Sequence, residues 1–265
     1  MTEQATAVIA PVATGRPHRV KRWFYIGAGL FMILVSVAGF GPSIIDQSGR
    51  KAPPTPLVIA HGVVASAWLL LFLAQATLVA TSRVDVHRRL GRVGPGLAVV
   101  MSALVFLTTV EMGRRGYDLS FDVTRAFPPP GSSEAENAAD ILSPLLGFLA
   151  FPVLVSAGLW YRHRPDIHKR LMLFAVLGLH GVPLTHLTGY LIGYWPAQAG
   201  LFSLIGRAIG ILLLSASAVY DKVSQGRLHP VSLWVPILIV AWEFVLGSVV
   251  VPSVAWREFA TWLIR

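Results

Sequence analysis

Three histidines lie inside long apolar stretches of the chain, where an imidazole has little water to solvate it. His61 and His186 each fall about one to two turns from the same end of the helices that these stretches predict, and His180 lies deeper. Imidazole is a ligand of haem iron, copper and non-haem iron, and helix bundles commonly hold such sites. The spacing therefore predicts that His61 and His186 bind haem b, or a copper or iron ion, with His180 nearby.

Two charged side chains in the same half of the predicted bundle support a different hypothesis. Arg207 and Glu243 are each costly in a bilayer, so an ion pair between them is the simplest way to keep both charged. Such a pair, with Gln75 and Tyr190 as further polar groups, would suit a carrier or sensor for a small molecule or a proton. A third hypothesis is a structural or assembly protein without a cofactor, in which these groups only hydrogen-bond between helices.

One predicted helix carries a regular series of polar side chains. His61, Trp68 and Gln75 recur at seven-residue intervals, so they share one face of a helix with Ala65 and Phe72. Polar groups inside a membrane usually face other helices or a cavity rather than lipid. We therefore expect this face to look into the bundle.

A short sequence occurs twice between apolar stretches, at residues 83–90 (RVDVHRRL) and 164–171 (RPDIHKRL), with an abbreviated version at 226–230. This pattern is consistent with a repeated two-helix unit or with a shared loop composition. We interpret both full copies as loops at the membrane surface, in which the aspartates cap the following helices and orient the histidines. A structural role is expected for the motif residues, which are Asp85, His87, Asp166, His168 and His229.

The elements that position these residues follow from the composition. Hydrophobic residues make up 54% of the 265 residues and charged residues only 13%, which is typical of a membrane protein. The absence of cysteine excludes disulfides and thiolate metal sites. A net charge of +9 comes largely from arginines beside apolar stretches, so anionic lipid headgroups are expected partners and nucleic acid is not.

Seven stretches are long and apolar enough to cross a bilayer, so the sequence predicts an all-α, seven-helix transmembrane bundle over residues 22–252. Residues 1–21 would form a cytoplasmic tail and residues 253–265 an interfacial helix. The predicted spans lie near residues 22–46, 57–81, 95–113, 141–161, 171–193, 200–220 and 232–252.

Lysine and arginine decide the predicted orientation of the bundle. They are concentrated before the first span and after the second, fourth and sixth, which places the N-terminus inside and the C-terminus outside. The first span also has features of a secretory signal peptide, and its removal would leave six spans with the same orientation.

Several function classes lack the residues that they need. The lysines all fall in predicted loops or flanks, which excludes a retinal Schiff base. No motif for nucleotide hydrolysis or for a serine hydrolase occurs in a suitable context. The spacing of His87, His163 and His168 is a poor match to the histidine boxes of membrane di-iron enzymes. We therefore do not expect an enzyme, although a redox role stays open.

Three strings carry a resemblance to known sequences. Residues 61–68 (HGVVASAW) with 72–75 (FLAQ), residues 85–91 (DVHRRLG) and residues 168–172 (HKRLM) resemble a group of uncharacterised bacterial multi-pass membrane proteins. The resemblance covers roughly the second to the fifth predicted span, and the layout is loosely similar to that of cytochrome b561-type bundles. It implies the bacterial inner membrane and no particular activity. A homo-oligomer or a redox partner stays open.

Overall fold

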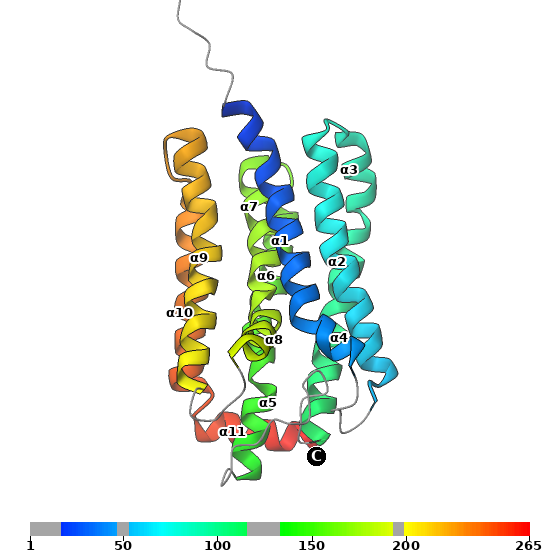
Figure 1. Ribbon diagram of the computed structural model, residues 1–265, viewed down its shortest axis with the longest axis vertical. Helices are drawn as coiled ribbons and strands as arrows, with labels where there is room; N and C mark the ends of the chain where they lie inside the picture. The colour runs from blue at the N-terminus through cyan, green and yellow to red at the C-terminus, as the bar shows by residue number, and fades with distance from the viewer. Residues whose placement is uncertain (1–16, 47–52, 116–132, 193–198) are drawn as a thin grey trace, which may run out of the picture.

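The computed structural model describes residues 17–46, 53–115, 133–192 and 199–265, and every regular element in these ranges is a helix. Most helices run side by side along the long axis of the molecule, and the C-terminal helix lies across one end (Figure 1). The predicted all-α bundle is therefore confirmed. Most of the predicted N-terminal tail and the side chain of Tyr190 lie outside the described residues.

Several of these helices follow one another almost without interruption. The elements are α1 (Pro17–Ile45), α2 (Pro56–Ala80), α3 (Val84–Gly91), α4 (Val93–Arg115), α5 (Glu134–Phe148), α6 (Ala150–Trp160), α7 (Pro165–Leu177), a 3₁₀ turn (Gly178–His180), α8 (Gly181–Ile192), α9 (Ala199–Gln225), α10 (Pro230–Val245), a π-helical turn (Leu246–Val250) and α11 (Val254–Ile264).

Six helical segments within the described ranges are long and apolar enough to cross a membrane. By length and composition, the protein is therefore a multi-pass membrane protein. The segments are Trp23–Ile45, Pro56–Ala80, Val84–Arg115, Glu134–Trp160, Pro165–Gly189 and Pro230–Val250.

Both full copies of the repeated motif are helical, which corrects the expectation that they are loops. Helices α3 and α7 start at Val84 and Pro165, before the predicted starts at 95 and 171. Asp85 and Asp166 lie in the first turns, where a carboxylate interacts favourably with the helix dipole, and Pro165 suits the first helical position. His87 and His168 therefore lie on helices, about one turn after the first residues of α3 and α7, respectively.

Helix α7 is the centre of the bundle. Leu173, Phe174, Ala175 and Val176 are fully buried, so this part of the helix is covered on all sides. It packs most closely against α6 and also contacts α1, α9 and α10. On either side of this centre, α1 packs against α2 and α8, and α2 packs against α4. The positions of the polar side chains are therefore set by the contacts of these helices.

Candidate functional site

The three predicted intramembrane histidines lie in separate environments. His186 on α8 is fully buried, and its ring centre is 4.7 Å from that of Phe40 on α1. His180 donates from Nδ1 to the Leu177 carbonyl oxygen at 2.5 Å, and its Nε2 lies beside Gly210 on α9. His61 is on α2, and α1 packs against both α2 and α8. The helix that carries His61 and the helix that carries His186 therefore both use α1 as a packing partner.

No metal centre is evident in the part of the chain that the structure describes. Within it, no group of three or more His, Asp or Glu side chains is arranged to hold an ion. Binding of haem b, or of a copper or iron ion, by His61 and His186 stays a prediction.

The expected ion pair between Arg207 and Glu243 is not formed. Both side chains are exposed. The Arg207 guanidinium lies beside Gly247: a Cβ atom added to this glycine would be 3.5 Å from Nη2. The Glu243 carboxylate lies beside Gly147 of α5, where an added Cβ atom would be 3.1 Å from Oε1. Each charge is therefore directed at a different glycine, which allows the backbone to approach it closely.

The polar face of α2 looks inward, as its spacing predicts. Trp68 is 2% exposed, and its ring centre is 4.9 Å from that of Phe151 on α6. His61 and Gln75 are half-buried. We call His61, Trp68 and Gln75 the α2 row. Each contributes one buried polar atom (Nδ1, Nε1 and Oε1, respectively) to which no described group of the protein is hydrogen-bonded.

The α2 row lies where α2 packs antiparallel to the consecutive helices α3 and α4. At one end the Thr55 hydroxyl donates to Glu111 Oε2 on α4 at 3.2 Å. At the other end an added Cβ atom on Gly91 would be 3.1 Å from Gln75 Nε2. From Thr55 to Gln75 the helix advances about 30 Å at 1.5 Å per residue, which is about the thickness of a hydrocarbon core. The row itself, from His61 to Gln75, covers about 21 Å of this length.

A further buried hydroxyl lies on α4 near Glu111. Thr108 is 5% exposed and lies three residues before Glu111, on the same side of α4. Its Oγ1 is also without a hydrogen bond to any described group.

The two copies of the repeated motif meet in space, a contact that the sequence did not predict. The ring centres of His87 on α3 and His168 on α7 are 6.4 Å apart, and the rings are nearly perpendicular, at 81°. His168 Nδ1 is 2.7 Å from the Gly158 carbonyl oxygen. Because a carbonyl can only accept, Nδ1 carries the hydrogen and Nε2 keeps its lone pair. We call His87 and His168 the imidazole pair; it lies at the Gln75 end of the α2 row.

A buried ion pair next to the imidazole pair was missed by the sequence interpretation. Arg170 and Asp221 are both fully buried, and Arg170 Nε donates to Asp221 Oδ2 and to Ser232 Oγ, at 3.0 Å in each case. Arg170 Nη2 is also bonded to Asp221 Oδ1, and Nη1 donates to the Asp166 carbonyl oxygen at 2.5 Å. The pair joins α7 to α9 and α10 at the same end of the bundle.

The abbreviated motif joins this network through His229, at the start of α10. Its Nδ1 accepts from the Val231 amide at 3.2 Å, so Nε2 carries the hydrogen and donates to Asp166 Oδ2 at 3.1 Å. His229 precedes the first residue of its helix, as Arg83 and Arg164 do. It therefore corresponds in structure to these arginines, and not to His87 or His168.

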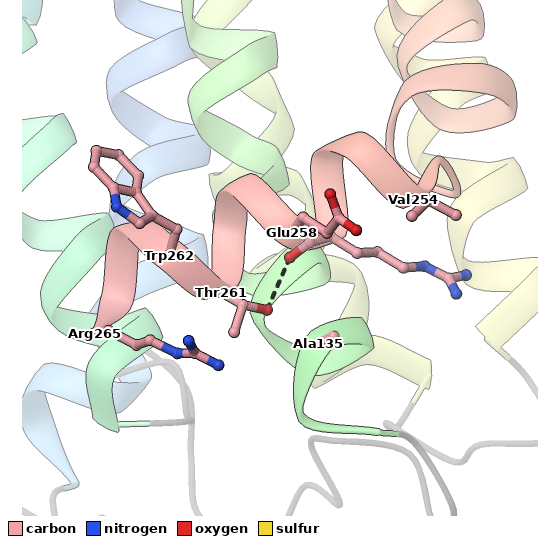
Figure 2. Close-up of a pocket in the computed structure, with 7 residues that line it drawn as sticks. Ala135, Val254, Glu258, Thr261, Trp262 and Arg265 are labelled. Carbon is pink, nitrogen blue, oxygen red and sulfur yellow. Dashed lines mark hydrogen bonds between the residues drawn. The ribbon is translucent and has the colours of Figure 1, made fainter.

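A shallow hollow of about 470 Å³ lies away from all predicted site residues, between α11 and the first turn of α5 (Figure 2). Thr261 donates its hydroxyl to the Arg257 carbonyl oxygen at 2.8 Å. Figure 2 shows Trp262 and Arg265 near Thr261. Trp262 is 68% exposed. Tryptophan and arginine side chains suit a membrane–water interface, and the interfacial role of the C-terminal helix stays a prediction.

Comparisons with protein-family models, with curated proteins and with solved structures gave no match.

Proposed function

We propose that this protein conducts protons across a membrane along the α2 row. The observation that carries the proposal is the line of buried polar atoms on one face of α2, which have no hydrogen bond to a described group. Buried polar atoms in native proteins are almost always hydrogen-bonded, to ordered water where no protein group is available. This supports a hydrated seam between α2, α4 and α6.

The side chains of the row have different roles in the proposed path. His61 can accept a proton at one ring nitrogen and release one from the other, because imidazole changes its charge near neutral pH. The Trp68 indole only donates, whereas the Gln75 amide donates and accepts. These two side chains hold water in line and are not themselves protonated.

Each end of the proposed path has a titratable group. Glu111 stands at the Thr55 end, where Arg115 forms an ion pair with its other carboxylate oxygen at 2.6 Å. The imidazole pair stands at the Gln75 end, beside the basic residues of the repeated motif. By the positive-inside rule, the Glu111 end faces outward and the imidazole pair faces the cytoplasm. An inside-negative potential would therefore drive protons from Glu111 towards the pair.

The proposal includes a seventh span and the predicted orientation. Helix α9 is 27 residues long, which is enough to cross a bilayer. It runs beside α10 (Figure 1). With α9 counted, the charged segments alternate so that the N-terminus is inside and the C-terminus outside, as in a bacterial inner-membrane protein. Labelling of single cysteines introduced at either end of α9 in intact cells would test this topology.

The proposed function is tested by proton entry into vesicles. Purified protein is reconstituted with a pH-sensitive dye inside, and a potassium diffusion potential is imposed. We expect acidification faster than in protein-free vesicles, and roughly tenfold slower for His61→Phe because the relay imidazole is lost. His163→Phe is the matched control, since His163 is exposed and lies outside the row. Equal rates for protein-containing and protein-free vesicles would refute the proposal.

A further inference from the structure

We infer that the imidazole pair is a binding site for a single first-row transition-metal ion, with Zn²⁺ as the simplest occupant. His87 and His168 come from different copies of the motif, 81 residues apart, and their ring centres are 6.4 Å apart. Two metal–nitrogen bonds of about 2.0 Å hold imidazole centres about 5 to 6 Å apart, depending on the angle at the ion. The observed 6.4 Å is slightly longer than this range, so rotation of a side chain is required for both rings to bind one ion.

The hydrogen bonding of His168 is that of a metal ligand. Its Nδ1–H donates to the Gly158 carbonyl oxygen at 2.7 Å, which fixes the ring and leaves the Nε2 lone pair for an ion. His87 Nδ1 is buried, and no described group is hydrogen-bonded to it. Nδ1 of His87 and Nε2 of His168 therefore each lack a hydrogen bond to a described group, which is the state that a metal ligand requires.

The pair is flanked by closely packed helices. An added Cβ atom on Gly158 would be 2.8 Å from Met172 Sδ, and one on Gly91 would be 3.1 Å from Gln75 Nε2. Helices α6 and α7 are therefore in close contact on one side of the pair, and α2 and α3 are in close contact on the other side. Of the basic residues next to the pair, Arg88 is exposed and acts electrostatically on His87, whereas Lys169 Nζ lies 5.8 Å from the centre of the Tyr25 ring.

Two protein ligands make an exchangeable site. In the described part of the chain no third His, Asp or Glu joins the pair to hold an ion, so water would complete the coordination shell. Structural zinc sites have four protein ligands, whereas sites with open positions retain water. The imidazole pair is therefore suited to reversible occupation. If the proposed function holds, an ion there closes the cytoplasmic end of the proton path; this second step rests on the proposed function, whereas binding does not.

Binding is measured by equilibrium dialysis of the full-length protein in detergent against ZnCl₂, with the metal counted by mass spectrometry. We expect one Zn²⁺ per chain, and at least about tenfold weaker binding for His87→Asn and for His168→Asn, which keep a polar side chain of similar size. His163→Asn is the matched control, with unchanged binding. Thermal unfolding of each variant verifies that it is folded. Unchanged binding in both pair variants, or no binding by the wild type, would overturn the inference.

A second measurement separates the two proposals. Zn²⁺ added inside the vesicles should slow proton entry for the wild type, whereas the rate for His168→Asn should be the same with and without zinc, whatever that variant's own zinc-free rate is. One outcome is that the variants lose zinc binding while zinc does not slow wild-type proton entry. This outcome would support the metal site and would contradict its place in the proton path.

Discussion

Replacement of Arg170 by alanine is expected to lower the free energy of unfolding by about 3–5 kcal/mol. The substitution leaves the Asp221 carboxylate fully buried without its guanidinium partner, and it also removes the hydrogen bonds to Ser232 and to the Asp166 backbone. Breaking one side of a buried ion pair costs far more than the pair contributes over an apolar replacement. Denaturant titration of the purified protein in detergent, followed by helix content, measures the change.

The first copy of the motif supplies a matched control for Arg170. Arg89 occupies the equivalent motif position but is exposed, so Arg89→Ala should change stability by no more than about 0.5 kcal/mol. The double variant Arg170→Ala with Asp221→Ala removes both charges and should recover part of the loss. Equal effects of Arg170→Ala and Arg89→Ala would contradict a structural role for the buried pair.

Replacement of Gly39 by alanine is the second change with a large expected effect. An added Cβ atom would collide with the backbone carbonyl of Pro183, which lies against Gly39 where α1 meets α8. Because neither backbone can rotate away as a side chain does, the two helices must separate. We expect a loss of about 1–3 kcal/mol, the usual cost of overpacking. Thermal unfolding in detergent measures it.

Gly27 is the control for Gly39 on the same helix. It is exposed, and an added Cβ atom would have no neighbour within 4 Å. Gly27→Ala should therefore be neutral or stabilising, because alanine favours the helix by about 1 kcal/mol over glycine. A fall in stability for Gly27→Ala as large as that for Gly39→Ala would show that the contact with Pro183 is not the cause.

The helical membrane fold could be predicted from the sequence because apolar length alone determines which segments can cross a bilayer. The starts of α3 and α7 could not. Their first turns contain Asp85, Asp166 and several basic residues, which lower the hydropathy and suggest a loop. In the structure the same aspartates favour the helical starts through the dipole. Hydropathy therefore identified the spans but not the polar turns that extend them.

The site could be predicted only where it depends on one helix. The inward face of α2 followed from the seven-residue spacing, which is a local property. The contact between His87 and His168 depends on how distant helices pack, and no local pattern encodes it. Arg170 was interpreted only as a basic residue at the membrane surface, because its partner Asp221 lies 51 residues further along the chain. A single aspartate at the end of an apolar stretch was the one available signal.

The most direct test of the proposed proton path is the rate of proton entry into vesicles that contain Gln75→Leu. Leucine is close to glutamine in size and removes a buried amide oxygen that has no hydrogen bond to a described group, so the fold should be as stable as before or more stable. We predict a rate roughly tenfold or more below that of the wild type, and an unchanged rate for Thr77→Val, an exposed position on the same helix. A wild-type rate for Gln75→Leu would contradict the path along the α2 row.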